Sequence, residues 1–450
     1  MNNMELAKAD RICHYTKKSI IELLPIILFV VLLYLANTIL NFLIWISLVP
    51  VIIYIYRQKN IVNFLWQISL VAFLGSIPFI YYIKQFDFIY FILALVLTAL
   101  IYIVTFLLCW FAYRKIKYPY IVLALPLIWL VMLNLCVFIP EFSKVLDFSF
   151  MQPMAAPLIR AVGNQGMVFL IILLNSLLAF YILLREKRIL KYLIFIVVII
   201  LTCFIYSYCA VPSGKKVRVA LIQGNIYNNW EWRTANVNSS IIDIYEELTK
   251  EAAKSKPDII IWPEYAIPND ITFDKNLFDR ISKIAKESNA YLVFGSIGLT
   301  DQTDLKYDFI ENVANVFSRE GVFIGKYTSV LPFPFGGRIV PGNDLHVFDT
   351  DIGKFGIIAC NEENYSYIYK LYAEKGVNFF IAIANDLPMY NLNRTKAKAT
   401  FSRLAAAENN LYLLRVANTG YTQVINPYGK IIASLKPNKR DVLVADIYIK

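Results

Sequence analysis

Two side chains in the second half of the chain have the chemistry of a proton acceptor and a nucleophile. Glu264 ends the segment IIIWPE and Cys360 ends the segment FGIIAC, each after a run of apolar residues that predicts a buried strand. Open α/β sheets place their sites at the carboxyl ends of their strands. We therefore expect Glu264 and Cys360 to converge in one cleft.

Both residues also have an ordinary interpretation. Partial burial beside Trp262 would raise the pKa of Glu264 toward the range of a general base, whereas the alternative is a surface acid at a strand end. A helix that begins at Cys360 would lower the pKa of its thiol and favour the thiolate. The remaining cysteines lie in or beside the apolar first half, where packing is their default role: Cys13, Cys109, Cys136, Cys203 and Cys209.

A cysteine nucleophile needs a base, and histidine is scarce in this chain. His14 precedes the first apolar segment, and His346 begins a predicted strand, where a histidine is more often structural. Glu264 is therefore the preferred partner of Cys360. A cation is expected beside them, because the attack of a thiol on a carbonyl creates an oxyanion. The sequence indicates neither a metal nor an organic cofactor.

Two further features flank this pair. Glu362 lies two residues after Cys360, where it either bonds within the same site or is solvated. The segment GKYTSVLPFPFGGRIVPG, at residues 325–342, is rich in proline, glycine and aromatic residues. Such a segment lines a site or simply connects two hairpins.

The elements that must position these residues form an α/β domain, expected at 212–450 after the linker VPSGKK. Short apolar runs alternate there with amphipathic segments, which is typical of a layered α/β fold. Its first strands are predicted at 217–226, 257–264 and 290–298, its first helices at 238–254 and 275–289, and two hairpins at 312–328 and 346–360. Further helices and strands are predicted as far as KIIASL, at 430–435.

The first half of the chain, 1–211, is predicted to be a transmembrane domain. The chain has 450 residues, of which 58% are hydrophobic and 17% charged, and its mean hydropathy is +0.54. These values exclude a wholly soluble protein and a disordered one. About 20 apolar residues cross a bilayer core, and we predict seven spans, near 19–36, 39–56, 61–83, 88–112, 119–139, 167–184 and 189–208.

The basic residues between the spans predict the orientation. With a cytoplasmic N-terminus, thirteen lysines and arginines fall on the inner side and three on the outer side. This asymmetry follows the positive-inside rule and places the α/β domain on the outer face. Much of the net charge of +11 then serves topology and anionic lipid rather than nucleic acid, for which no binding module is visible.

The ordered motifs resemble a known family. VALIQGNI, IWPE, PFG, IAND and LYLLRVANTGYTQVINPYGK stand in the order seen in the carbon–nitrogen hydrolase (nitrilase) superfamily. Together with the seven spans, the chain resembles the membrane-bound branch of that superfamily, the apolipoprotein N-acyltransferases. The resemblance implies a nitrilase-like αββα sandwich behind an all-α transmembrane bundle.

This resemblance also implies an activity and partners. Glu264 would be the general base, and Cys360 would take a fatty acyl chain from a phospholipid as a thioester. The chain would then pass to the N-terminal amine of a diacylglyceryl-cysteine lipoprotein. The implied partners are a phospholipid donor, a diacylglyceryl lipoprotein acceptor and the lipid bilayer, without a cofactor. The implied location is the bacterial cytoplasmic (inner) membrane, multi-pass, with a periplasmic catalytic domain.

The chain departs from the family pattern around the cation. The family places a lysine two residues after Tyr327, where this chain has Ser329. Lys326 is the nearest lysine and the expected oxyanion stabiliser, although an odd shift along a strand points it to the opposite face unless a bulge intervenes. The residues expected to bind substrate are Glu362, Trp262, Phe335 and Arg338, the last of which is a second candidate cation.

These departures keep two alternatives open. A membrane-tethered amidase or hydrolase of the same superfamily would let water take the thioester. A catalytically silent homologue would only bind lipidated proteins, an interpretation that the missing lysine favours and the retained Glu264 and Cys360 oppose.

Overall fold

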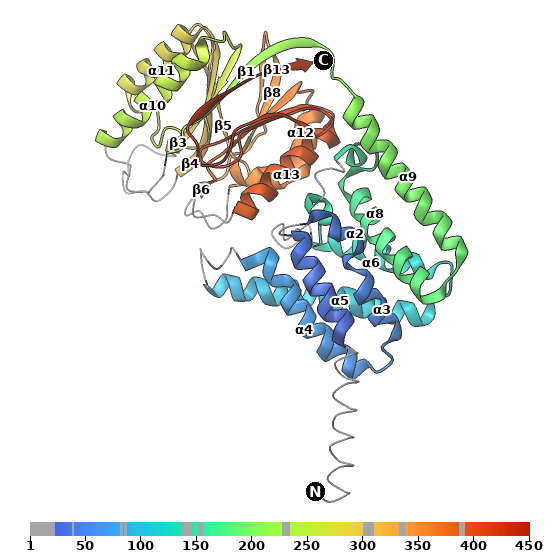
Figure 1. The fold of residues 1–450 in the computed structure, drawn as a ribbon. Coiled ribbons are helices and arrows are strands. Elements are labelled where there is room, and N and C mark those ends of the chain that lie inside the picture. The colour runs from blue at the N-terminus through green and yellow to red at the C-terminus, as the bar shows by residue number, and fades with distance from the viewer. Residues whose placement is uncertain are drawn as a thin grey trace, which may run out of the picture. The chain divides into compact units, whose positions relative to one another are not determined.

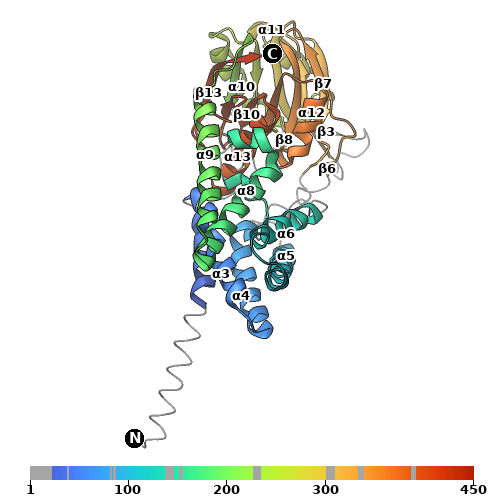
Figure 2. The same cartoon turned by 90° about the vertical axis from the view of Figure 1, so that its right-hand side faces the viewer.

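The structure is a computed structural model that describes residues 23–37, 40–81, 84, 88–136, 146–151, 156–226, 235–299, 310–332, 339–386 and 392–450. The chain forms two compact units, one drawn mainly from residues up to Phe204 and the other mainly from Ile205–Lys450. The first unit is helical, and the second contains two β-sheets with helices on their outer faces (Figures 1 and 2).

Apolar helices lie at each of the seven predicted spans. They are Leu23–Asn37, Asn41–Arg57 (η1, Asn41–Leu43; α2, Ile44–Ser47; α3, Val49–Arg57), α4 (Ile61–Ile80), α5 (Phe88–Lys115), α6 (Ile121–Leu135), α8 (Ala156–Leu184) and α9 (Lys187–Cys209). Three stretches in the described part of the chain are long and apolar enough to cross a membrane: Phe88–Lys115, Leu158–Leu184 and Lys187–Tyr206. Four further apolar stretches are shorter: Leu23–Asn37, Asn41–Arg57, Ile61–Ile77 and Ile121–Leu135.

Helix α8 begins at Ala156, well before the predicted start at 167, and Gly163 interrupts it with a φ of 70°. Its residue Asn175 is fully buried and joins two helical segments. The side chain accepts a hydrogen bond from the backbone N–H of Leu48 at 2.9 Å and donates to the carbonyl oxygens of Ile44 and Ile171, both at 2.9 Å. A neutral amide thus satisfies backbone groups inside the helical unit.

The second unit is the expected four-layer αββα sandwich. The first sheet has the order β13-β1-β2-β3-β4-β5, with β6 beside β4, and the second has the order β12-β11-β10-β9-β8-β7. Helices α10 (Ala235–Ala253) and α11 (Lys275–Ser288) pack on the first sheet, and α12 (Ser366–Glu374) and α13 (Leu392–Asn409) pack on the second (Figure 1). The predicted fold class is therefore confirmed.

The strands agree with the predicted positions to within a few residues, with two additions, at Ile339–Val340 and at Asp441–Ile449. They are β1 (Lys215–Gln223), β2 (Ile259–Ile261), β3 (Tyr291–Leu299), β4 (Ile310–Phe317), β5 (Phe323–Thr328), β6 (Ile339–Val340), β7 (Val347–Thr350), β8 (Gly353–Ala359), β9 (Phe379–Ala384), β10 (Tyr412–Ala417), β11 (Gln423–Ile425), β12 (Ile431–Ser434) and β13 (Asp441–Ile449). Strand β13 was not predicted, and it pairs antiparallel with β1 along its whole length.

Alternation along the strands separates three apolar cores. In β2, Ile259 and Ile261 face the core between the two sheets, whereas Ile260 faces the core beneath α10 and α11. In β8, Ile357 faces the core between the sheets and Ile358 the core beneath α12 and α13. Because successive side chains point to opposite faces, the strand direction determines which residues can reach the strand ends together.

Candidate active site

Glu264 and Cys360 follow strands of different sheets. Strand β2 ends at Ile261, and Glu264 stands three residues later with 2% of its surface exposed. Strand β8 ends at Ala359, and Cys360 opens the short 3₁₀ helix η7 (Cys360–Asn364). Both residues therefore lie at carboxyl ends of strands, as their positions in the sequence predict.

The two side chains interact with each other: the Cys360 thiol lowers the pKa of Glu264, and the Glu264 carboxylate raises the pKa of the thiol. Asn312 of β4 donates its Nδ2 to Glu264 Oε1 at 2.7 Å, and the backbone N–H of Asn385 donates to Oε2 at 2.8 Å. Gly295 of β3 leaves room for this backbone, since a Cβ there would lie 2.6 Å from the Cα of Glu264. These contacts hold the carboxylate against the thiol.

Burial raises the pKa of Glu264 from its ordinary value of 4.5 to about 7. Lys398, the Cys360 thiol and the donors Asn312 and Asn385 act in the opposite direction and keep the pKa from rising further. A carboxylate with a pKa near neutrality can accept and return a proton within one reaction cycle. Glu264 thus has the properties of a general base.

Cys360 has a strained backbone and a protonated resting state. Its φ is 48°, in the left-handed region that a residue with a Cβ rarely adopts. Burial, followed by the neighbouring Glu264 carboxylate, raises the pKa of the thiol above its ordinary value, although Lys398 opposes this. The expected lowering of the thiol pKa by a helix start is wrong, because burial and Glu264 outweigh it. The thiol therefore needs a base to become nucleophilic.

A lysine that the sequence analysis did not single out contacts the thiol. Lys398, on α13, places its Nζ 3.9 Å from Cys360 Sγ. The ammonium also pairs with Asp386 Oδ1 at 3.2 Å and with Glu363 Oε2 at 3.3 Å. Burial by itself would lower the pKa of Lys398, but Asp386, the Cys360 thiol and Glu363 together raise it. Lys398 is therefore a cation in this cluster.

Arg415 completes the charge balance. The side chain is fully buried in β10, and it pairs with Glu363 at 2.8 Å and with Asp386 at 2.7 Å. Burial opposes ionisation of Asp386, but Arg415 and Lys398 overcome it and lower the pKa of that carboxyl. Two cations and two anions thus balance one another. The pair of Glu264 and Cys360 adds a negative charge when Glu264 loses its proton, as the pH rises through about 7.

The C-terminal half of the chain matches a known family. Residues 218–450 match the model of the carbon–nitrogen hydrolase family. The chain belongs to the carbon–nitrogen hydrolase family. The matched region contains Glu264, Cys360 and every charged residue of the cluster around them.

Several relatives carry a more specific name. The chain is 29% identical over 265 residues to an apolipoprotein N-acyltransferase of Geobacter metallireducens, covering 54% of this chain and 50% of that one. It is 25% identical over 315 residues to the apolipoprotein N-acyltransferase of Aquifex aeolicus, covering 64% and 67%. The chain thus spans about half to two thirds of the length of these relatives. A solved nitrilase-superfamily member of Saccharomyces cerevisiae is 21% identical, with a TM-score of 0.44, over 52% of this chain and 92% of that one.

Within this carbon–nitrogen hydrolase domain, Lys326 does not reach Cys360. It lies on β5, 42% exposed, and pairs with Glu311 at 2.7 Å. Its neighbour Tyr327 is buried and donates its hydroxyl to Glu362 at 2.7 Å. The strand alternation explains this outcome, since the two side chains must point to opposite faces. The structure therefore does not place Lys326 as the cation beside the thiol.

Glu362 holds a loop rather than facing open space. The carboxylate is fully buried. It accepts five hydrogen bonds, from the side chains of Tyr327 and Ser329 and from the backbone N–H groups of Val330, Leu331 and Ala359. Burial raises its pKa, and these donors oppose that shift. Glu362 thereby ties the segment after β5 to the turn that carries Cys360, which leaves its oxygens engaged within the protein.

Trp262 belongs to the core beneath α10 and α11 rather than to the cluster. Its Nε1 donates to Thr249 Oγ1 at 3.0 Å, and its ring stacks on Tyr245 with 4.9 Å between centroids. The side chain is fully buried, so the structure does not present it to a substrate. Phe335 and Arg338, the other two expected binding residues, lie outside the described residues.

Sequence reasoning missed Lys398, Asp386, Glu363 and Arg415, although two of them left a signal. Arg415 interrupts the apolar strand LYLLRVA, and a charge in a buried strand requires buried partners. Asp386 follows the strand of β9 in IAND as Glu264 follows that of β2 in IIIWPE. Lys398 gave a weaker signal, since the apolar and polar residues of its helix are not clearly segregated.

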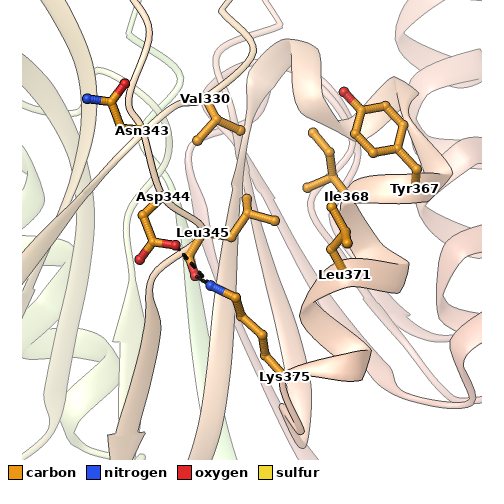
Figure 3. A pocket seen from close by; sticks show the side chains of 8 residues that line it. All are labelled: Val330, Asn343, Asp344, Leu345, Tyr367, Ile368, Leu371 and Lys375. Carbon is orange, nitrogen blue, oxygen red and sulfur yellow. Dashed lines mark hydrogen bonds and ion pairs between the residues drawn. The ribbon is translucent and has the colours of Figure 1, made fainter.

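A groove of about 350 Å³ opens beside this site, and its position is shown in Figure 3. Its lining is Val330, Asn343, Asp344, Leu345, Tyr367, Ile368, Leu371 and Lys375. The ammonium of Lys375 bonds Asp344 at 2.9 Å and the carbonyl oxygen of Leu345 at 2.6 Å at one side of it. Val330 is the lining residue whose backbone N–H also bonds Glu362, at 2.7 Å. The groove thus adjoins the Glu362 loop but does not contain Glu264 or Cys360.

Proposed function

We propose that this protein transfers a fatty acyl chain from a phospholipid to the N-terminal amine of a diacylglyceryl-cysteine lipoprotein. The interacting pair of Glu264 and Cys360 carries the proposal, because it supplies a base and a nucleophile at one point. The apolar helices of the first unit and the similarity to apolipoprotein N-acyltransferases support a lipid substrate.

The first half-reaction loads the thiol. Glu264 takes the Cys360 proton while the sulfur attacks the ester carbonyl carbon of the phospholipid. The tetrahedral intermediate collapses with cleavage of the carbon–oxygen bond, and Glu264 returns the proton to the leaving alkoxide of the lysophospholipid. Cys360 then holds the acyl chain as a thioester. The pKa of about 7 suits Glu264 to both proton transfers.

The second half-reaction empties the thiol. The neutral amine of the acceptor attacks the thioester carbon, Glu264 accepts the amine proton, and the carbon–sulfur bond breaks to release the amide. The thiolate recovers its proton from Glu264. If water attacked in place of the amine, the product would be a free fatty acid, which is the outcome of the hydrolase alternative.

The test uses the full chain reconstituted with a phospholipid whose acyl chain is isotopically labelled. Cys360 is the only cysteine in the tryptic peptide Phe355–Lys370, so mass spectrometry can locate an acyl adduct on its sulfur. We expect the adduct in the wild type, its disappearance when a diacylglyceryl peptide is added, and labelled amide as the product. Because Glu264 must accept a proton, adduct formation should slow as the pH falls below about 7.

Matched cysteine variants make this test specific. Cys360→Ala should abolish both adduct and amide, whereas Cys209→Ala, which removes an exposed cysteine outside the cluster, should change neither. Labelled fatty acid without amide would reject transfer in favour of hydrolysis. Amide formation by the Cys360→Ala variant would refute the thioester route.

We propose in addition that residues 1–211 form a multi-pass transmembrane domain in a bacterial cytoplasmic membrane and that residues 212–450 form a periplasmic catalytic domain. The thirteen-to-three distribution of basic residues supports this orientation. Alkaline phosphatase, which is active only outside the cytoplasm, should be active when fused after Lys450 and inactive when fused after Arg185. The reverse pattern would contradict the orientation.

A further inference from the structure

Lys398 contacts the reacting sulfur, and the acyl transfer described above leaves it without a role. We propose that Lys398 is a catalytic residue that stabilises the thiolate of Cys360 and the oxyanion of its acyl adduct. The cation is supplied by helix α13 of the second sheet rather than by strand β5 of the first. The oxyanion part of this inference rests on the proposed acyl transfer, whereas the thiolate part concerns the free protein.

The first argument is proximity in a buried place. The Nζ of Lys398 lies 3.9 Å from Cys360 Sγ, and 9% of the lysine is exposed. A charge at this distance acts strongly where water is excluded, because the effective dielectric constant is low. When Glu264 takes the thiol proton, the electron pair left on sulfur faces the ammonium. Lys398 keeps its own proton and needs only to remain in place.

The second argument is that strand β5 offers no cation here. Ser329 stands where the family resemblance leads us to expect a lysine, and its buried hydroxyl donates to Glu362 at 2.9 Å. Lys326 points to the other face of the strand and pairs with Glu311. A cation beside the thiol therefore has to come from another element, and α13 supplies it.

The third argument is that the surrounding charges fix the ammonium. Asp386 and Glu363 each pair with both Lys398 and Arg415, so each buried carboxylate bridges two cations. If Lys398 moved away from the sulfur, Asp386 and Glu363 would each lose one of their two ion pairs. Such a loss is strongly unfavourable in a buried site. Asp386, Glu363 and Arg415 are thus positioning residues for Lys398.

The experiment measures the reactivity of the thiol itself. The full-length protein in detergent micelles is treated with iodoacetamide over a series of pH values, and alkylation is followed on the tryptic peptide Phe355–Lys370. The central variant is Lys398→Met combined with Asp386→Asn, which removes one cation and one anion and leaves the net charge of the cluster unchanged. Lys398→Arg retains the charge, and Lys326→Met is the matched surface control.

We expect the double variant to alkylate at least about tenfold more slowly at neutral pH, with the thiol pKa raised by about one unit or more. Asp386→Asn alone should not slow alkylation, because it removes an anion that raises the pKa of the thiol and leaves Lys398 paired with Glu363. Lys398→Arg should stay closer to the wild type than the double variant, and Lys326→Met should match the wild type. Circular dichroism establishes that each variant is folded.

Two results would overturn the inference. One is wild-type alkylation in a folded double variant, and the other is an equal loss in Asp386→Asn alone, since the effect would then not come from Lys398. This measurement needs no acyl transfer. A protein that alkylates as expected but transfers no acyl chain would leave the role of Lys398 at the thiolate intact and remove the proposed function.

Discussion

In the helical unit a buried polar side chain is an amide or a hydroxyl, whereas in the α/β unit several buried side chains are charged. Among the residues that the structure describes, the buried polar side chains before residue 205 are Ser47, Gln67, Ser76, Thr98, Thr105, Ser149, Asn175 and Ser176. The buried charged side chains of the described residues all lie in the α/β unit: Glu264, Glu362, Glu363, Asp386, Lys398 and Arg415.

This difference shows where the chain tolerates buried charges, which are unfavourable unless they are paired. Moving a charge out of water is costly unless partners compensate it, so a core that only needs to be stable is better built from neutral groups. The buried side chains of the helical unit follow that rule, and its half-buried Asp147 is held by hydrogen bonds from Ser149 and Asn164. The α/β unit departs from it around Cys360, where charge can activate a thiol. The following predictions test whether the two regions really differ in this way.

The largest effect is expected for Arg415→Met. The substitution leaves Asp386 and Glu363 with Lys398 as their one remaining cation in the cluster. We expect the free energy of unfolding to fall by about 3–5 kcal/mol, as when one partner of a buried ion pair is removed. The measurement is unfolding of the detergent-solubilised protein followed by circular dichroism.

Arg218→Met is the control for that prediction. Arg218 is 39% exposed and pairs with Asp446 at 2.9 Å on the surface of the same unit. Its loss should change the free energy of unfolding by about 1 kcal/mol or less. Equal destabilisation by the two arginine variants would show that burial of charge around Cys360 has no special energetic weight.

The second effect is a pH dependence that Glu264→Gln should remove. Burial raises the pKa of Glu264 from 4.5 to about 7, so the folded chain binds this proton more tightly than the unfolded chain. Its contribution to stability is therefore complete below pH 4.5 and is lost as the pH rises through about 7. Relative to the wild type, the variant should gain up to about 3 kcal/mol across this range.

The measurement for Glu264→Gln is the unfolding midpoint of both proteins at a series of pH values. The sign of the change matters more than its size, because the amide also alters the hydrogen bonds with Asn312 and Asn385. A difference between the two proteins that stays constant with pH would contradict the raised pKa.

A smaller effect is expected in the helical unit for Asn175→Leu. The substitution removes the acceptor of the Leu48 N–H and the donor to two carbonyl oxygens. We expect destabilisation of about 1–2 kcal/mol that does not change with pH, because no charge is involved. Thr98→Val, which removes a hydroxyl bonded within its own helix, should cost less. A strong pH dependence of the Asn175 variant would break the contrast between the two regions.

The smallest effect is expected for Lys326→Met. The ion pair with Glu311 is partly exposed, so its loss should change stability by about 1 kcal/mol or less. Added salt should reduce even this difference, since it screens exposed charges. A double-mutant cycle with Glu311→Gln gives the pair energy directly. A pair energy well above about 1 kcal/mol would contradict the expectation that this exposed ion pair contributes little to stability.

Much of the fold was predictable because it depends on local patterns. Alternating apolar runs indicated the strands, and the two hairpins turn at Glu320-Gly321 and at Asp351-Ile352-Gly353, as the positions of the two glycines predict. Strand β13 was missed because Asp441 and Asp446 interrupt its pattern, and its formation depends on pairing with β1 far away in the chain. The helix α8 starts earlier than predicted since its first turns are not continuously apolar.

The candidate site was predictable where chemistry coincides with a strand end, as at Glu264 and Cys360. The position of Lys398 was not predictable, because its neighbours on the buried face of α13 are Thr395 and Ser402, which are polar and do not mark a core position. Which helix covers which strand end is a property of the packing between layers. The prediction for Lys326 failed for a related reason. Lys326 was chosen because it is close in sequence to the expected position, but alternation along β5 places its side chain on the opposite face.

The pairing of β1 with β13 has a consequence for how this domain comes into being. During synthesis β1 leaves the ribosome long before its antiparallel partner, so one of its edges stays without hydrogen bonds until the rest of the domain has been made. That edge therefore stays unpaired while residues 224–440 are being made. Docking of β13 onto β1 then closes the sheet only after the rest of the domain has been synthesised.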